Sequence, residues 1–251
     1  DSPMQAYEMM GHKLRDTIRL LCNPDPERSG RRLIVFTRYP EPGKTKTRLI
    51  PILGPEGAAT LHRRMTEHTL RRVRQFLANH PVSLRIQYDG GNEEGLRQWL
   101  GADLRTVPQG EGDLGRRMHL AFTEAFAEGI RRVVLIGTDC PGIRPDHLAG
   151  AFQALGRKDA VIGPARDGGY YLIGLNEPAP HLFDGIPWGT GEVLQRTVDA
   201  ASASDRRVVL LDPLEDVDRP EDIPAWEEEV HAGGLADEPK ALSIILPAID
   251  E

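Results

Sequence analysis

Short apolar runs alternate with longer amphipathic segments along most of the chain. The runs expected to form strands are 33–36, 82–88, 104–107, 133–137, 160–164, 170–175 and 208–211. Helix-like spacing of apolar residues predicts helices at 55–79, 93–100, 114–129, 145–156, 191–202 and 220–230. Strands that alternate with helices in this way predict an α/β domain with a largely parallel sheet and helices on both faces.

The runs at 160–164 and 170–175 are separated by only a short, glycine-containing segment. A parallel connection needs a crossover of about a dozen residues or more, usually a helix. One of these two strands is therefore expected to run antiparallel to its neighbours. The predicted architecture is a three-layer αβα, Rossmann-like fold with a mixed, mostly parallel sheet.

Changes in composition divide the chain into four parts. Residues 5–22 have the apolar spacing of an amphipathic helix, and a segment with two prolines and a glycine follows them. We therefore interpret 1–30 as a helical extension and 31–230 as the main domain. Residues 231–240 are rich in glycine and charge and predict a linker. The apolar tail at 241–251 is strand-like, and such a strand needs partners.

The composition narrows the classes of function. The chain has 251 residues, of which 39% are hydrophobic and 27% charged, as in folded water-soluble domains. Its formal net charge of −7 disfavours a nucleic-acid partner, because such proteins usually carry a basic surface. The sequence contains no apolar run near the roughly 20 residues that span a membrane, and its first residues lack the apolar core of a signal peptide. Two distant cysteines, Cys22 and Cys140, predict no disulfide framework and favour a cytoplasmic location.

A basic segment, PGKTKTRL at 42–49, directly follows the first predicted strand. Gly43 lets the backbone approach a phosphate closely, and Lys44, Lys46 and Arg48 supply positive charge. Open α/β sheets bind ligands beyond the carboxyl ends of their strands, which is where this segment lies. In an acidic chain the cluster favours a small anionic ligand. The alternative is a solvated basic loop.

Aspartates also follow two of the predicted strands. Asp139 ends the run VVLIGTD, and Asp216 and Asp218 follow the last strand and share one face of an extended segment. Carboxylates at strand ends can hold Mg²⁺ or Mn²⁺ against a diphosphate, and we expect Asp139 to do so with Asp218 or Asp216. The alternative for each is a structural role at the start of the next helix.

Two glycine-containing loops complete the candidate site. The first, GPARDGGYY at 163–171, either leaves room for a ligand beside Gly168 and Gly169 or is a plain hairpin turn. The second, QGEGDLGRRM at 109–118, opens a helix and suits a flat base or a phosphate. Alternatively, Asp113 in this loop only caps that helix.

Six motifs occur in the order PGKTKTRL, GDLGRRM, LIGTDCPG, GPARDGGYYLIGL, IPWGT and DVDRPED within 31–230. In this combination the chain resembles the bacterial glycosyltransferases of GT-A fold associated with arsenosugar biosynthesis, the radical-SAM/selenodomain-associated transferases. It is more distantly similar to 2-phospholactate and molybdenum-cofactor guanylyltransferases. The tail LSIILPAIDE resembles the first strand of a family-two glycosyltransferase, which implies a fused or partner transferase.

The resemblance implies roles for individual residues. Those expected to contact the nucleotide are Gly43, Lys44, Lys46, Arg48, Gln109, Gly112 and Gly115. Those expected on the acceptor side are Asp167, Gly168, Gly169 and Trp188. The metal ligands would be Asp139 and Asp218, with Asp216 as the alternative to the latter. The catalytic residues would be Asp139, Lys46 and Asp167, the last as a candidate general base.

These expectations favour a metal-dependent glycosyltransferase that uses a nucleotide-diphosphate sugar and a small-molecule acceptor. The first alternative is a nucleotidyltransferase that consumes a nucleoside triphosphate, forms a nucleotide-diphosphate product and releases pyrophosphate. The second is a non-catalytic nucleotide-binding module. The sequence leaves open the base, the sugar, the acceptor, the stereochemical outcome and whether the chain forms a homo-oligomer.

Overall fold

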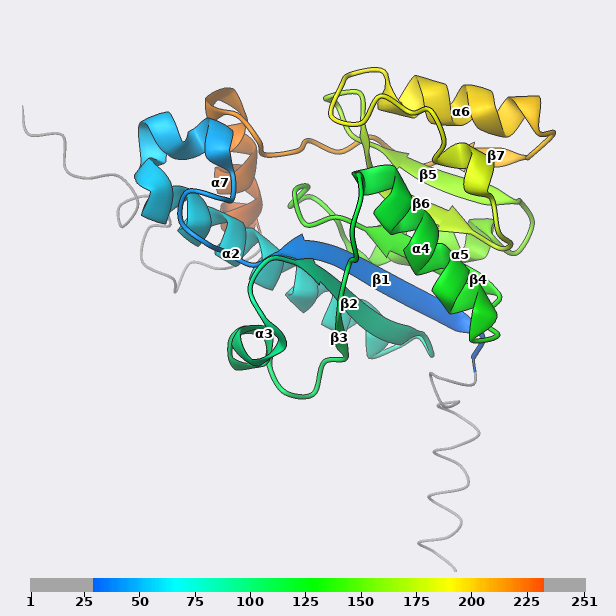
Figure 1. Ribbon diagram of the computed structural model, residues 1–251, viewed down its shortest axis with the longest axis horizontal. Coiled ribbons are helices and arrows are strands. Elements are labelled where there is room, and N and C mark those ends of the chain that lie inside the picture. The colour runs from blue at the N-terminus through cyan, green and yellow to red at the C-terminus, as the bar shows by residue number, and fades with distance from the viewer. Residues whose placement is uncertain (1–28, 233–251) are drawn as a thin grey trace, which may run out of the picture.

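A seven-stranded mixed sheet lies at the centre of the protein (Figure 1). The computed structural model describes residues 29–232. The strands are β1 (Arg31–Arg38), β2 (Ser83–Asp89), β3 (Thr106–Pro108), β4 (Arg132–Ile136), β5 (Ala160–Pro164), β6 (Tyr170–Leu175) and β7 (Val208–Leu210). The α-helices are α2 (Ile50–Leu77), α3 (Glu93–Leu100), α4 (Leu114–Ala127), α5 (Pro145–Ala154), α6 (Val193–Ala203) and α7 (Ile223–Ala232). Single 3₁₀ turns lie at Thr47–Leu49, Pro180–Leu182 and Pro220–Asp222.

The strand order is β3-β2-β1-β4-β6-β5-β7. Strand β6 runs antiparallel to its neighbours β4 and β5, and the other neighbouring pairs are parallel. The expected antiparallel strand is therefore confirmed as β6. The order reverses between β1 and β4, because β2 and β3 lie on the other side of β1. Such a reversal leaves a crevice at the carboxyl ends of the strands, where α/β proteins bind ligands.

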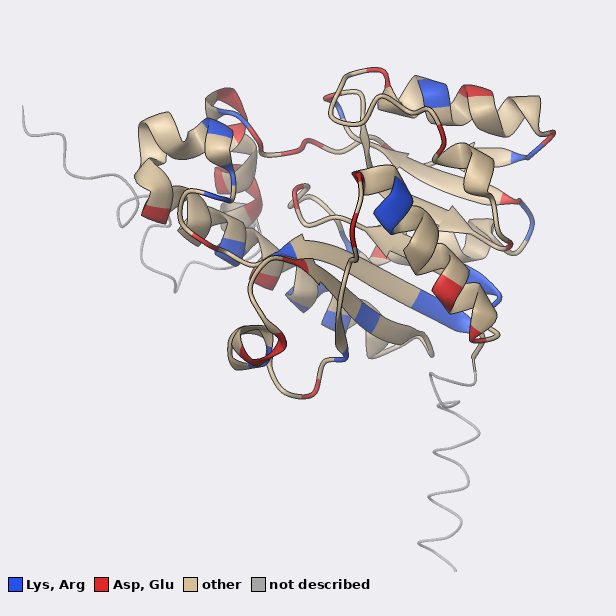
Figure 2. Ribbon diagram, in the orientation of Figure 1, with Lys and Arg blue, Asp and Glu red and all other residues tan. Residues whose placement is uncertain are grey.

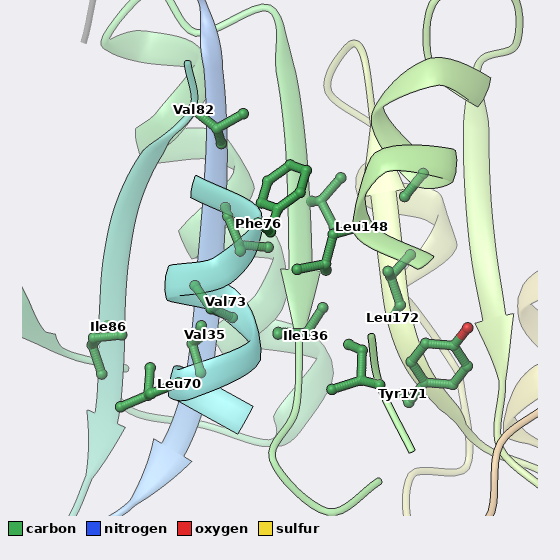
Figure 3. Packing of buried hydrophobic residues seen from close by; sticks show 14 of the residues in the cluster. Val35, Leu70, Val73, Phe76, Val82, Ile86, Ile136, Leu148, Tyr171 and Leu172 are labelled. Carbon is green, nitrogen blue, oxygen red and sulfur yellow. The ribbon is translucent and has the colours of Figure 1, made fainter. Parts of the chain in front are cut away.

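Side chains that alternate across the sheet form two apolar layers. Val35 of β1 faces a layer covered by α2, α3 and α5, and its neighbour Ile34 faces the layer covered by α4 and α6. Figure 3 shows the first layer, in which Phe76 of α2 and Leu148 of α5 pack over the strands. Burial of both sheet faces confirms the predicted three-layer αβα fold.

A smaller apolar cluster joins the start of α2 to α7, beside the sheet (Figure 1). Val217 and Trp226 are buried there against Leu53. The helix predicted from Pro55 has an extra turn ahead of it, because Gly54 adopts a φ of 68° and Pro55 restarts the helix. The cluster fixes the segment after β7 against the segment after β1, and both segments carry candidate site residues.

The predicted elements agree in type with the observed ones. The bounds of α3, β5 and β6 match the prediction, and the other elements differ by a few residues at their ends. The expected helix at 5–22 and the strand-like tail at 241–251 lie outside the described residues. The predicted linker also lies outside them, except for its first two residues, which end α7. None of the helices within 29–232 is long and apolar enough to cross a membrane.

Candidate functional site

Candidate residues from three distant segments converge at the carboxyl ends of β1 and β4. Lys46 comes from the loop after β1, Asp139 follows β4, and Asp218 lies in the segment after β7. Acidic and basic segments of the chain meet beyond the arrowhead of β1 (Figure 2). This point is where the strand order reverses, so the fold itself brings the three segments together.

Lys46 lies at the centre of this site, with its side chain only 4% exposed. Its ammonium Nζ is 2.6 Å from Asp139 Oδ1 and 3.8 Å from Asp218 Oδ1. The same ammonium donates a 2.6 Å hydrogen bond to the carbonyl oxygen of Val217. The backbone of Lys46 is left-handed, with φ 47° and ψ 45°, a conformation that costs on the order of 1 kcal/mol in a residue other than glycine. Lys46 therefore acts as a cation placed between two carboxylates.

Further contacts fix the two aspartates. The backbone N–H of Val217 donates to the carbonyl oxygen of Asp139 at 2.9 Å, and Arg48 forms an ion pair with Asp218. The Asp139 side chain remains 56% exposed and accessible to a ligand. Desolvation by nearby protein atoms raises the pKa of Asp139, but the Lys46 ammonium outweighs it and the net pKa lies below the usual value. Asp139 is therefore an anion at neutral pH.

A buried histidine that the sequence did not single out contacts the end of β1, just before the basic loop. Nε2 of His62, on α2, lies 2.9 Å from the carbonyl oxygen of Arg38. Burial lowers the pKa of His62, although Asp139 opposes the shift. A neutral ring that donates its Nε2–H to this carbonyl fits both facts. The sequence signal for its burial is its position next to Leu61 in the apolar stripe of the helix.

Asp216 and Asp167 form a second acidic pair at the site. Burial first, and the charge of Asp167 second, raise the pKa of Asp216 to about 6. Asp167 is exposed, and its Oδ1 accepts a 2.8 Å hydrogen bond from the N–H of Gly169. The ammonium of Lys46 pairs with Asp218 and not with Asp216. This pairing favours Asp218 as the partner of Asp139.

The residues predicted on the acceptor side form a turn packed against the start of α6. Gly168 has a φ of 91°, and a Cβ there would lie 2.7 Å from the carbonyl carbon of Gly191, so only glycine fits. Trp188 fills the space beside Gly115, where an added Cβ would lie 2.6 Å from Cε2 of the indole. The structure thus places Gly115, expected near the base, in direct contact with Trp188, expected on the acceptor side.

The side chain of Gln109, which was expected near the base, is already bonded within the protein. Its Nε2 donates to the carbonyl oxygens of Thr37 and Gln87, each at 3.1 Å. Gln109 therefore joins the ends of β1 and β2. Exposed loops carry three further residues predicted to contact the nucleotide: Gly43, Lys44 and Gly112.

The candidate donors for a divalent ion at this site are Asp139 and Asp218, with Asp216 as the alternative to the latter. Their carboxylates bracket one ammonium, so a cation already lies between them. No group of three or more His, Cys, Asp or Glu side chains that could hold a metal ion occurs within residues 29–232. Mg²⁺ usually takes only one or two protein carboxylates and completes its shell with water and substrate phosphates. The donor set therefore fits a metal ion that binds together with a phosphorylated ligand.

The fold and much of the sequence are shared with known bacterial proteins. A family described as "uncharacterized protein conserved in bacteria (DUF2064)" matches residues 69–190, which include Asp139. A crystal structure from Desulfovibrio desulfuricans G20, with the provisional name nucleotide-diphospho-sugar transferase, is 36% identical and has a TM-score of 0.77. The alignment covers 86% of this chain and 94% of that one. The chain belongs to the same family as this Desulfovibrio protein.

The same fold occurs in structures of much lower sequence identity. The 4-diphosphocytidyl-2C-methyl-D-erythritol synthase of Anaerococcus prevotii DSM 20548 is 12% identical, with a TM-score of 0.52 and coverage of 80% of this chain and 97% of that one. A homologue of Mycobacterium tuberculosis Rv0371c from Mycobacterium sp. strain JC1 is 15% identical, with a TM-score of 0.52 and coverage of 83% and 99%. These two show the fold alone. With the Desulfovibrio relative, they confirm the Rossmann-like fold of nucleotide-diphospho-sugar transferases. No curated protein matches the chain.

Proposed function

We propose that this protein is a metal-dependent glycosyltransferase that moves a sugar from a nucleotide-diphosphate donor to a small-molecule acceptor. One observation carries the proposal: Lys46, Asp139 and Asp218 meet where the strand order reverses. A diphosphate requires positive charge and a metal ion requires carboxylates, and both are available at this point. The name of the 36% identical relative supports the donor class.

The basic loop binds and orients the diphosphate in this proposal. The side chains of Lys44 and Arg48 are 69% and 58% exposed and can reach a ligand in the crevice. Lys46 is nearly buried, but its ammonium sits on a flexible stem that can turn from the carboxylates to a phosphate. Positive charge held in place before the reaction stabilises the charge that develops on the leaving diphosphate.

Asp139 and Asp218 hold Mg²⁺ or Mn²⁺, with Asp216 as the alternative second ligand. When bound, the ion supplies Lewis-acid stabilisation of the departing diphosphate. The low pKa of Asp139 keeps its carboxylate ionised for this role at neutral pH. The ion pair between Arg48 and Asp218 keeps the second carboxylate oriented toward the same point.

Asp167 and Trp188 mark the acceptor side. Asp167 is exposed and fixed by its hydrogen bond to the Gly169 N–H, so we assign it as the base that receives the proton of the acceptor hydroxyl. The half-buried indole of Trp188 forms the wall next to α4. The resemblance to transferases associated with arsenosugar biosynthesis favours a small, soluble acceptor, and we place the reaction in the cytoplasm.

Product analysis tests the proposal. The protein is incubated with Mn²⁺ and a panel of nucleotide sugars, without and with candidate acceptors, and the products are separated by chromatography. Release of a free nucleoside diphosphate, lost in Asp139→Asn and kept in the exposed control Asp146→Asn, is the expected result. Full turnover by Asp139→Asn would contradict the proposed role of that carboxylate.

Nucleotidyl transfer is the second candidate, because three cations on one loop, Lys44, Lys46 and Arg48, also suit a triphosphate. The same assay with nucleoside triphosphates and phosphorylated acceptors separates the two reactions. Release of pyrophosphate from a triphosphate supports nucleotidyl transfer and contradicts glycosyl transfer. Binding of nucleotides without either product supports a non-catalytic module.

A further inference from the structure

A charged network that the sequence did not single out joins the ends of β1 and β2. Arg38 and Asp89 are register partners at the last residues of these strands. Arg38 donates to Asp89 Oδ2 from Nε at 3.1 Å and from Nη2 at 2.7 Å. Arg117 of α4 lies on the other side, with Nη1 3.2 Å from the same oxygen. Burial raises the pKa of Asp89, but the bonds from the two arginines outweigh it and the net pKa is lowered.

Each arginine also holds one loop of the candidate site. Arg38 Nη1 donates to the carbonyl oxygen of Lys44 at 3.1 Å, in the basic loop. Arg117 Nε donates to the carbonyl oxygen of Gly112 at 2.9 Å, in the glycine-rich loop. The two loops are far apart in the sequence, and Asp89 stands between the side chains that hold them.

A second path leads from the same arginine to the end of β1. Arg117 Nη1 donates to Gln109 Oε1 at 3.4 Å, and the amide of Gln109 is bonded to the carbonyl oxygen of Thr37. The glycine-rich loop is therefore attached to the sheet at both of its ends. Loss of Asp89 would remove the link between Arg117 and Arg38 while leaving this second path intact.

The network contributes little to global stability. The side chains of Arg38, Asp89 and Arg117 are 51%, 31% and 23% exposed. Ion pairs between such partly exposed groups contribute little, because solvent screens them. The effect of these ion pairs on the position of the two loops matters more for function than their effect on stability. A displacement of about 1 Å in positioning groups can cost about a hundredfold in rate.

We propose that Asp89 is a positioning residue that holds the basic loop (42–49) and the glycine-rich loop (109–113) at a fixed separation. With both loops in place, one ligand can bind through its diphosphate and its nucleoside at once. The inference rests on the proposed function in assigning those two parts of the ligand to the two loops. The link between the loops rests on the hydrogen bonds alone.

Asp89→Asn in the full chain tests the proposal, with Asp159→Asn as the matched control. Asp159 also accepts two guanidinium bonds, from Arg207 Nε at 3.0 Å and Nη2 at 3.1 Å, but it lies at the amino end of β5, away from the site. Hydrogen exchange of the loop amides is measured without ligand. Affinities are then measured with Mn²⁺ for the four ribonucleoside diphosphates and for inorganic pyrophosphate.

Faster exchange in both loops is expected for Asp89→Asn and in neither loop for Asp159→Asn. We expect nucleoside diphosphate affinity to fall by about tenfold or more and pyrophosphate affinity by much less, because pyrophosphate needs only one loop. Asp89→Glu, which keeps the charge, should recover part of both effects. If Asp89→Asn fails to fold, Asp89→Ser makes the same comparison, because it leaves both arginines in place and removes the carboxylate that accepts from them.

Unchanged exchange in either loop would overturn the proposal, as would equal loss of affinity in the Asp159 control. A wild-type protein that binds none of the four nucleoside diphosphates would contradict the proposed function. The exchange measurement would still decide whether Asp89 links the loops.

Discussion

Replacement of Lys46 by methionine gives the most direct test of the site. Methionine keeps an unbranched apolar stem in the buried position and the same left-handed backbone requirement, so the change is confined to the ammonium. Two carboxylates and one carbonyl lose their cation. The proposed metal ion would contact the same two carboxylates, so Lys46 and the ion compete for them. Lys46→Met should therefore lower the stability of the metal-free protein and increase the stabilisation that Mn²⁺ provides.

The size of the first effect follows from the contacts that are lost. A hydrogen bond to a charged group contributes about 1.5–3 kcal/mol, and Lys46 makes two such bonds at 2.6 Å. The exposure of Asp139, 56%, and the relief of the buried ammonium both reduce the loss. We expect a net loss of about 1–2 kcal/mol, which corresponds to a melting temperature lower by about 2–8 °C for a domain of this size.

The second effect is measured by thermal unfolding in a series of Mn²⁺ concentrations. Binding to the folded state adds RT ln(1 + [L]/Kd), or about 2.7 kcal/mol at a hundred times the dissociation constant. The increase in melting temperature with Mn²⁺ should be larger for Lys46→Met than for the wild type. Lys44→Met is the control, because Lys44 lies on the same loop but is 69% exposed and pairs with Glu41. Its Mn²⁺ response should equal that of the wild type.

The reasoning fails if Mn²⁺ raises the melting temperature of Lys46→Met no more than that of the wild type. Equal increases in all three proteins would mean that Mn²⁺ binds elsewhere. The absence of any increase, with pyrophosphate also present, would remove Asp139 and Asp218 as metal ligands. A direct count of bound Mn²⁺ by electron paramagnetic resonance then checks whether the ion binds at all in each protein.

Three further substitutions, one of them with a matched control, test other parts of the structure. Asp216→Asn should stabilise the protein by about 1 kcal/mol near pH 7, because the pKa of Asp216 is raised to about 6 and its ionisation is therefore costlier in the folded state. In urea unfolding this gain in stability should vanish below about pH 4, and a gain that does not change with pH would contradict the reasoning. Gly115→Ala should cost about 1–3 kcal/mol of stability, because the added methyl group overlaps Trp188. Its control is Gly150→Ala, where the added methyl group meets open space and should stabilise α5 by up to about 1 kcal/mol. Equal melting temperatures of the two variants would refute this prediction. Glu128→Gln should cost about 1–2 kcal/mol, because Glu128 pairs with two buried arginines at 2.6 and 2.7 Å but is itself 38% exposed, so solvent screens part of the interaction. Burial raises the pKa of Glu128, but the two arginines outweigh it and lower this pKa to about 2. The stabilisation by Glu128 is therefore complete above about pH 4.5 and is lost as the pH falls toward 2. A difference in urea unfolding that does not change with pH would contradict this prediction.

The sheet could be predicted from the sequence because its strands are continuous apolar runs. Strands β5 and β6 have the expected bounds, and the short connection between them required a change of direction. The first turn of α2 could not be predicted in the same way. Its residues lie before Gly54 and Pro55, which normally separate a helix from what precedes it, and they pack against Trp226 from the far end of the chain. Local pattern does not contain that contact.

The meeting of Lys46, Asp139 and Asp218 could be predicted because the carboxyl ends of parallel strands share one edge of a sheet. The inward turn of Lys46 could not, because it depends on a left-handed backbone at a residue that usually avoids it. Asp89 was missed for a different reason. In the sequence it only ends a strand, and its importance comes from a register that places it opposite Arg38.

The electrostatics of the site explain why metal ion and diphosphate should bind together in the proposed function. Lys46 is the nearly buried cation that faces Asp139 and Asp218, while Asp216 resists ionisation. An ion that displaces the ammonium from both carboxylates would leave it buried with only the carbonyl oxygen of Val217 as a partner, which is costly for a charged group. A diphosphate in the crevice offers the ammonium new acceptors and lowers that cost. Each ligand thus improves the affinity for the other by the same factor, since coupling between two binding equilibria is reciprocal.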